Sequence, residues 1–502
     1  MAYQARPADF EVAIIGSGFG GIGAGYRLKE AGMHDFVIFE RAFDVGGTWR
    51  QNTYPGCQCD IPSHLYSLSF ALNPNWSRTY PLQEEIRDYL RDCAARFGLM
   101  PHLRFGDEVF EARWNDADRL WELETTSGLT TARVVIAAQG SFSEPRLPDI
   151  PGRDTFEGVS LHSAEWDHDV DLAGKSVAVI GTGASAIQLV PNIRPEVGRL
   201  HLFQRTPPWV MPHTDRPITN AERWLYRRLP VLQRIARSFA YLLRECASPA
   251  FNRDVRLIAP LEIHARRHMR KQVKDPVLRT RLTPNYRLGC KRILLSNEWY
   301  PALQKDNVEV VTDGIAEITP RGIRTSAGQE TELDVIIYAT GFEVTDVPFA
   351  KRVVGRGRKR LSDVWDGSPQ AYKNTTVPAF PNLFLIPGLQ TGYSSQIFMI
   401  ESQLNYVIGA LSFMRRRGVA TLEVAAANFR AWNESVEERL ARTVWSTGGC
   451  TSWYVDRNGL ATMAWPDFTW RFRRFTRRFD PAAHEISYEL RAASIDEGEM
   501  LD

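Results

Sequence analysis

Two glycine-rich turns, one at Gly16 and one at Gly181, constrain the fold of this chain more than any other feature. At the first turn, the apolar residues 11–15 (EVAII) precede Gly16-x-Gly18-x-x-Gly21, a helical pattern up to residue 32 and a second apolar run at 36–39. A strand, a glycine loop, a helix and a second strand in this order form the βαβ unit that binds dinucleotides. Gly16 permits the tight turn, Gly18 lets the backbone approach a pyrophosphate, and Gly21 lets helix and strand pack closely. The helix N-terminus would face the phosphates.

The second apolar run ends at Glu40. A carboxylate in this place accepts hydrogen bonds from the adenosine ribose hydroxyls and repels a 2′-phosphate. The first unit is therefore expected to bind FAD or NAD.

The second turn repeats the pattern without the acid. Residues 176–180 (SVAVI) lead into Gly181-Thr182-Gly183-Ala184-Ser185-Ala186, a helix, a strand at 200–203 and then Arg205-Thr206. A guanidinium binds phosphate through a bidentate fork, so Arg205 suits a 2′-phosphate. Arg205 would also fit a solvated surface, but after this loop we predict an NADP site.

The composition is that of an ordinary globular protein, with 502 residues, 44% hydrophobic and 24% charged, and a net charge of +2. The length predicts two or three domains, and the charge gives no reason to expect nucleic acid as a partner. Six cysteines do not make a disulfide framework, and Cys57 and Cys59 have neither metal-ligand nor redox-dithiol spacing. We therefore expect no metal site and a reducing cytoplasm.

No run of roughly 18 apolar residues appears, so no transmembrane helix is predicted. The richest short run, Phe239–Leu243, reads as a buried helix face. The surrounding arginine-rich, helical residues 216–282 could touch anionic lipid or nucleic acid. A helical insertion with a solvated basic side is the simpler interpretation.

These patterns predict an α/β fold with two Rossmann-like dinucleotide-binding domains. Period-two alternation over residues 103–136 predicts a small antiparallel insertion, and prolines at 143–151 mark a linker. The expected organisation is an FAD domain (1–142 and 376–502), an NADP domain (143–215 and 286–375) and a helical insertion (216–285).

Three further segments carry candidate chemistry. The first holds Gly46-Gly47-Thr48-Trp49, Tyr54-Pro55-Gly56 and Asp60, which could pass close to a flat ring or form an ordinary surface loop. The second holds Lys291-Arg292, a solvated pair or a cation aimed at an anionic oxygen intermediate. The third, between the two turns, reads Phe156-x-Gly158-x-x-x-His162-x-x-x-Trp166-Asp167, which by composition alone is an irregular linker.

Together these motifs resemble the type I Baeyer–Villiger monooxygenases, within the class B flavoprotein monooxygenases, over nearly the whole chain. The linking segment fits the family fingerprint. Its Trp166-Asp167 ending favours the Baeyer–Villiger branch over the related monooxygenases of amines and sulfides, which typically end the motif in Tyr with Lys or Arg. The Gly46–Asp60 segment fits a second fingerprint at its fixed positions.

The resemblance implies roles for individual residues. Arg292 is similar to the active-site arginine that stabilises the anionic flavin peroxide, and Asp60 to the acid that orients it. Lys291, Arg205 and Thr206 are similar to NADP contacts, and Trp453 to a C-terminal tryptophan that reaches the nicotinamide nucleotide. Tyr66 and Val109 fall where relatives line FAD, whereas His162 and Trp166 would belong to a hinge.

The implied reaction uses FAD, NADPH and O2 to convert a small-molecule ketone into an ester or lactone through a C4a-peroxyflavin. A monooxygenase acting on sulfides or amines is the nearest alternative. Two more distant alternatives are a disulfide reductase, although this chain has no usable CxxC, and a flavin-dependent sensor or scaffold without turnover. We expect a monomer or weak homo-oligomer.

Overall fold

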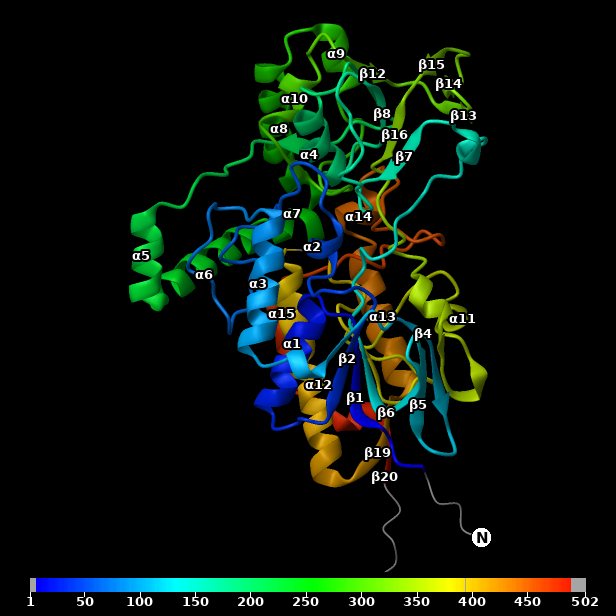
Figure 1. The fold of residues 1–502 in the computed structure, drawn as a ribbon. Coiled ribbons are helices and arrows are strands. Elements are labelled where there is room, and N and C mark those ends of the chain that lie inside the picture. Colours follow the sequence, from blue (N-terminus) through cyan, green and yellow to red (C-terminus); the bar gives the residue numbers. More distant parts are fainter. Residues whose placement is uncertain (1–5, 393, 489–502) are drawn as a thin grey trace, which may run out of the picture.

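The computed structural model describes residues 6–392 and 394–488. Two sheets organise the chain, one in the lower and one in the upper half of Figure 1. Both are built around a glycine turn at the carboxyl end of a buried strand, so the predicted α/β architecture with two units is confirmed.

The first sheet has eight strands in the order β17-β4-β5-β6-β1-β2-β3, with β18 paired to β6. Strands β1, β2, β3, β6 and β18 are parallel neighbours, while β4, β5 and β6 form an antiparallel meander. The antiparallel insertion was predicted from residue 103, but Leu103–Phe105 pairs in parallel with β2 and extends the main sheet instead. The strands are β1 (Phe10–Ile15), β2 (Phe36–Glu40), β3 (Leu103–Phe105), β4 (Val109–Asn115), β5 (Leu120–Thr125), β6 (Gly128–Ala137), β17 (Val353–Val354) and β18 (Leu383–Leu385).

Strand β17 pairs with β4, so the chain has already returned to the first sheet at Val353, upstream of residue 376. The segment around it contains η4 (Pro348–Lys351), η5 (Arg356–Arg358) and α11 (Leu361–Trp365). It therefore packs as part of the first unit.

Helices α1, α3 and α12 cover the first sheet, because each buries apolar side chains against it. Ile22 of α1, Leu90 of α3 and Leu404 of α12 are fully buried in one cluster. Helix α12 is long and apolar enough to cross a membrane, but 72% of that window lies inside the protein, as in a core helix. The helices of this unit are α1 (Phe19–Glu30), α2 (Thr48–Gln51), α3 (Gln83–Arg96), α12 (Gln396–Arg417), α13 (Ala426–Leu440), α14 (Val444–Thr447) and α15 (Thr469–Thr476). An antiparallel ribbon pairs β19 (Val419–Val424), directly after α12, with β20 (His484–Tyr488).

The second sheet is fully parallel, in the order β12-β9-β8-β16-β7. Its central strands β8 and β16 are apolar runs, as expected when both faces of a parallel sheet are covered. The elements are β7 (Val159–His162), β8 (Ser176–Ile180), α4 (Ala184–Ile193), β9 (Arg199–Phe203), α10 (Trp299–Ala302), β12 (Val308–Val311) and β16 (Val335–Tyr338), with an antiparallel appendage of β13 (Ile315–Thr319), β14 (Gly322–Thr325) and β15 (Glu330–Glu332).

The helical insertion leaves the second unit after β10 (Val210–Met211) and returns at β11 (Leu294–Leu295). Its first helix begins at a capping box, in which the Thr219 Oγ1 accepts from the Glu222 N–H at 3.2 Å. The members are α5 (Asn220–Arg228), α6 (Pro230–Cys246), α7 (Ser248–Asn252), α8 (Ala259–Gln272) and α9 (Pro276–Arg281).

The expected burial of Phe239–Leu243 is wrong. Phe239, Leu242 and Leu243 are 62%, 58% and 57% exposed. The cause is that α6 directs its polar residues inward, where they bind carbonyl groups of the first unit.

Candidate active site

A cavity opens at the carboxyl ends of the first parallel strands. Its walls are backbone at the glycine turn: an added Cβ at Gly16 (φ 101°) would lie 2.7 Å from the Ala138 carbonyl oxygen. Gly18 and Gly47 face each other, and a Cβ on Gly47 would lie 3.2 Å from the Gly18 Cα. The predicted residues that line the cavity are Gly16, Gly18, Glu40, Gly47, Thr48, Trp49, Tyr66 and Val109.

Gly21 lies behind the cavity rather than in its wall. A Cβ on it would come 1.8 Å from the Gly16 carbonyl oxygen, so only glycine permits this packing of α1 on the turn. Glu40 is buried and accepts hydrogen bonds from the Ser17 N–H (3.0 Å), the Ser17 hydroxyl (2.6 Å) and the Ala42 N–H (3.0 Å). The carboxylate thus fixes the turn and lines the cavity at once.

Helix α12 begins at this cavity, with Gln396, Ile397 and Ile400 in its lining. Its N-terminal N–H groups and positive dipole end therefore face whatever binds there. On the far side the Trp49 indole N–H donates to the Tyr66 hydroxyl at 2.9 Å, which fixes both rings.

The second glycine turn reproduces the first. Gly181 (φ 120°) donates to the Phe203 carbonyl at 3.2 Å, and a Cβ on it would lie 2.4 Å from the Ala339 carbonyl oxygen. A Cβ on Gly183 would meet no atom of the described residues within 4 Å, so among these residues this side of the loop is open. Thr182, Ala184 and Ser185 continue the loop into α4, where Ala186 is fully buried in place of the third glycine.

Two cations border that turn. The Thr182 hydroxyl donates to the Thr206 carbonyl at 2.9 Å, which fixes the loop that carries the exposed Arg205. Lys291 lies near it, with its Nζ 5.2 Å from the Tyr286 ring centroid. Burial and the Arg205 charge both lower the pKa of Lys291.

Arg292 and Asp60 meet between the two units. The Arg292 Nε donates to one Asp60 oxygen at 2.7 Å, and an Nη donates to the other at 2.6 Å. Burial opposes ionisation of both side chains. The charge and hydrogen bonds of the partner side chain outweigh the effect of burial in each case. The pKa of Asp60 is lowered and that of Arg292 is raised, so the pair stays ionic. The Arg292 side chain remains 37% exposed, open to a reacting group.

The loop that carries Asp60 is held against α4 of the second unit. Tyr54 donates to the Gln188 side-chain oxygen at 2.9 Å, and Gln188 donates back to the Gln58 carbonyl at 2.8 Å. At Gly56 (φ 82°) an added Cβ would come 2.1 Å from the Asn192 Nδ2. Tyr54-Pro55-Gly56 is thus the contact by which one unit positions the acid for the arginine of the other.

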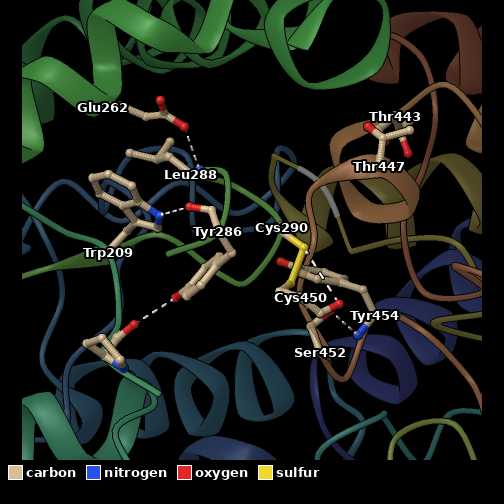
Figure 2. Close-up of a disulfide and its surroundings, with 11 residues drawn as sticks. Trp209, Glu262, Tyr286, Leu288, Cys290, Thr443, Thr447, Cys450, Ser452 and Tyr454 are labelled. Carbon is tan, nitrogen blue, oxygen red and sulfur yellow. Dashed lines mark hydrogen bonds between the residues drawn. A yellow bond between two sulfur atoms is a disulfide. The ribbon is translucent and has the colours of Figure 1, made fainter. Parts of the chain in front are cut away.

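The loop that carries Arg292 is held by polar contacts and a disulfide (Figure 2). The Trp209 indole N–H donates to the Tyr286 carbonyl at 2.8 Å, and the Leu288 N–H donates to Glu262 at 3.1 Å. Cys290 bonds to Cys450, with 6.1 Å between the Cα atoms. This cross-link ties the residue two positions before Arg292 to the segment that ends in Trp453.

The disulfide was not anticipated, because its partners are 160 residues apart. The other four cysteines are free, including Cys57 and Cys59, and burial raises the pKa of the Cys57 thiol to about 12. A buried protonated thiol is a poor nucleophile. Among the described residues of the first unit, Cys57 and Cys59 therefore do not form a reactive dithiol of the kind a disulfide reductase needs.

Trp453 belongs to a row of rings that reaches the linking segment. It stacks on Tyr454 at 4.1 Å and contacts Phe142 at 5.6 Å between centroids. Phe142 contacts Phe342 at 5.6 Å, and Phe342 contacts His162 at 6.0 Å. The row connects the C-terminal segment to the second sheet.

The linking segment forms an edge of that sheet rather than a surface for chemistry. A Cβ on Gly158 would lie 2.5 Å from both the Asp334 carbonyl oxygen and the Phe156 ring, so glycine is needed where the chain enters β7. Trp166 packs against the apolar core of the second unit, and the Asp167 carboxylate accepts a hydrogen bond from the Asp169 N–H at 2.9 Å.

His162 ends β7 and is buried. Its Nδ1 accepts from the Ala164 N–H at 3.1 Å, and burial lowers its pKa to about 4, so the ring is neutral near pH 7.

Sequence reasoning overlooked several residues of the site. Phe142, just before the proline-rich linker, and Glu144 within it line the cavity, and Glu144 pairs with Arg41 at 2.6 Å. Tyr454 lies by the Arg292–Asp60 pair, and burial raises its pKa to about 12. Only its place beside Trp453 could have pointed to it.

Comparisons with known proteins agree with this geometry. A family model described as pyridine nucleotide-disulphide oxidoreductase matches residues 13–237. A cyclohexanone monooxygenase structure from Rhodococcus sp. Phi1, bound to NADP+, matches with a TM-score of 0.85 and 28% identity over 96% of this chain and 100% of that one. A structure of OTEMO in complex with FAD and NADP matches with the same TM-score, identity and coverage.

Two sequence relatives cover almost the whole chain. A Baeyer-Villiger monooxygenase of Streptomyces coelicolor is 52% identical over 95% of this chain and 92% of its own length. A second, from Pseudomonas aeruginosa, is 45% identical over 99% of this chain and 96% of its own length. With these identities over nearly the whole length of both proteins, the chain belongs to the Baeyer–Villiger monooxygenases.

Proposed function

We propose that this enzyme binds FAD in the cavity of the first unit and NADPH at the second glycine turn, and inserts one oxygen atom of O2 beside a ketone carbonyl. The observation that carries the proposal is the bidentate pair of Arg292 and Asp60 between the two turns. A fixed guanidinium there stabilises negative charge that develops on a reacting oxygen.

The residues around the first cavity fit FAD. A pyrophosphate can approach the turn because Gly16, Gly18 and Gly47 present backbone there. Glu40 suits ribose hydroxyls, and the N-terminus of α12 suits an anionic ring edge. When bound, FAD would accept hydride from NADPH and activate O2.

At the second turn, we assign the NADPH phosphates to three groups. The open face of Gly183 would receive the pyrophosphate. Arg205 and Lys291 would bind the 2′-phosphate side, where an acid is absent from the end of β9 in the sequence Phe203-Gln204-Arg205.

The protein groups divide the remaining work. Asp60 orients the Arg292 fork while leaving its outer edge accessible. The buried ring of Tyr454 and the half-buried ring of the adjoining Trp453 would exclude water, which matters because water access releases hydrogen peroxide instead of product. His162, buried and neutral, would hold the hinge rather than transfer protons.

The test is product analysis with FAD-loaded enzyme, NADPH, O2 and a panel of small ketones. An ester or lactone heavier by one oxygen, formed one for one with NADPH, is the expected result. If ketones are untouched while a thioether in the same assay is converted to its sulfoxide, the enzyme is a heteroatom monooxygenase. If all consumed NADPH appears as hydrogen peroxide with both substrate classes, the proposed reaction is wrong.

We also infer a cytoplasmic enzyme that acts as a monomer or weak homo-oligomer. The four free cysteines, one of them exposed Cys246, agree with a reducing compartment, whereas the Cys290–Cys450 disulfide is of a kind that is rare there.

A further inference from the structure

Helix α6 packs with its polar side against the protein. The Gln233 amide donates to the Asn73 carbonyl at 2.6 Å. Arg237 donates to the carbonyls of three residues in the first unit at 2.8–3.0 Å, namely His64, Leu65 and Ser67. Glu245 accepts from the Thr469 N–H at 3.0 Å and from its hydroxyl at 2.7 Å. These contacts fix the rotation of the helix, because turning it would leave buried polar groups without partners.

The opposite side of α6 is apolar and faces solvent. Val231, Ile235, Phe239, Leu242 and Leu243, called here the outer face of α6, are 56%, 58%, 62%, 58% and 57% exposed. Spacings of three and four residues place them along one side of the helix. Figure 1 shows α5 and α6 projecting from the body of the molecule at the left. A soluble helix normally buries such a stripe, so this one is suited to a surface outside the chain.

The insertion is also strongly basic. Residues 216–285 contain 16 Lys and Arg against 5 Asp and Glu, a net charge of +11, although the whole chain carries only +2. Exposed Arg227, Arg228 and Arg234 lie on α5 and α6 themselves. The favoured partner is therefore both apolar and anionic.

A hollow lined by arginines lies close to α6. Tyr241 of α6 stacks on Phe398 at 4.8 Å, and the Arg473 guanidinium lies 5.3 Å from the same ring. Arg473 lines the hollow, whose remaining residues are Arg27, Asn405, Ile408, Gly409, Ser412, Arg416 and Arg477. Arg27 is paired with Glu30 at 2.9 Å. Four guanidinium groups around one hollow suit a phosphate-bearing headgroup.

We propose that the outer face of α6 docks on an anionic phospholipid bilayer, with its apolar side chains at the acyl boundary and the nearby arginines on the headgroups. An amphipathic helix with large apolar residues and flanking arginines has the chemistry of an interfacial membrane helix. A two-fold dimer through this face would bring two insertions of +11 together. Nucleic acid would use the arginines but leave the aliphatic row exposed to water.

The experiment uses FAD-loaded, full-length enzyme and vesicle flotation. Phosphatidylcholine vesicles with about 30 mol% phosphatidylglycerol are compared with pure phosphatidylcholine vesicles, at low and high salt. We expect binding to the anionic vesicles that weakens with salt. The variant Ile235→Ser/Phe239→Ser/Leu242→Ser should bind anionic vesicles at least about tenfold more weakly than the wild type. The variant Arg228→Gln/Arg234→Gln should have about tenfold lower affinity for anionic vesicles and unchanged affinity for pure phosphatidylcholine vesicles.

A matched control removes three apolar side chains of similar exposure elsewhere. Met100, Phe110 and Leu129 are 50%, 49% and 56% exposed, and their triple change to Ser should bind like the wild type. FAD absorbance and NADPH oxidation of each variant report that it is folded. The proposal is overturned if the wild type ignores anionic vesicles or if the α6 triple variant binds as well as the wild type. It is also overturned if light scattering shows that the outer face holds two copies together instead.

Discussion

Arg292 reaches Asp60 across 232 residues of sequence and binds both of its carboxylate oxygens, at 2.7 and 2.6 Å. The acid stands on a loop of the first unit and the arginine on a loop next to the second. Neither loop alone would hold its side chain in this orientation. Gln188 of α4 secures the first loop, and the Cys290–Cys450 bond secures the second. The pair therefore exists only when the two units are packed together.

Changing Arg292 to Ala should separate cofactor chemistry from oxygen transfer. We expect ester formation to fall by about a hundredfold or more, because a fixed positive charge near the developing anion is lost. FAD binding and NADPH oxidation should persist, with the electrons recovered as hydrogen peroxide. The measurement compares product by mass with NADPH consumed at 340 nm. Arg321→Ala, at an exposed ion pair with Glu332, is the control, and full ester yield in Arg292→Ala would refute the assigned role.

Opening the Cys290–Cys450 bond should loosen the segment that carries Trp453. We expect Cys450→Ser to lower the thermal midpoint, in line with the roughly 2–4 kcal/mol typical of a lost disulfide, and to reduce ester formed per NADPH. A reductant should impose the same change on the wild type and none on Cys450→Ser. Cys246→Ser removes an exposed free thiol and serves as the control. Unaltered coupling in Cys450→Ser would show that the bond does not support the site.

Gly56→Ala should push the Asp60 loop away from α4. The new Cβ would lie 2.1 Å from the Asn192 Nδ2 in a backbone of φ 82°. Gly32→Ala is a matched control, since its φ is 70° but its Cβ would meet nothing within 4 Å. Both changes incur about 1–2 kcal/mol of left-handed strain. Beyond this shared cost, only Gly56→Ala should lower the thermal midpoint and the ester yield. Equal midpoints and yields in the two variants would contradict the proposed contact between the Asp60 loop and α4.

His162 should make the fold sensitive to acid. Burial lowers its pKa from 6.5 to about 4, so the unfolded chain binds a proton more readily than the folded one between these values. Its contribution to stability is complete above pH 6.5 and is lost as the pH falls toward 4, by up to roughly 3 kcal/mol.

Thermal midpoints at pH 7 and pH 5 test this behaviour. The thermal midpoint of the wild type should fall more from pH 7 to pH 5 than that of His162→Gln, which carries no titrating ring. His264→Gln, at an exposed histidine, should follow the wild type. Identical losses in the wild type and His162→Gln would exclude His162 as the source.

The sequence by itself determined the two nucleotide turns. Each depends on neighbouring residues: a buried strand, glycines at fixed offsets and a helix that starts there. Such local patterns can be read directly, because the positive φ at Gly16 and Gly181 is a property of the turn itself and favours glycine. The linker and the antiparallel meander were predictable for the same reason.

Only the tertiary structure decided which distant residues meet. Cys450 could not be matched to Cys290, nor Tyr454 to the ionic pair, because long-range contacts follow from how the units pack. The periodicity of α6 reveals an apolar and a polar side but not which side is buried. That choice is made by the carbonyls at His64, Leu65 and Ser67, which bind Arg237 and thereby turn the apolar side to the solvent.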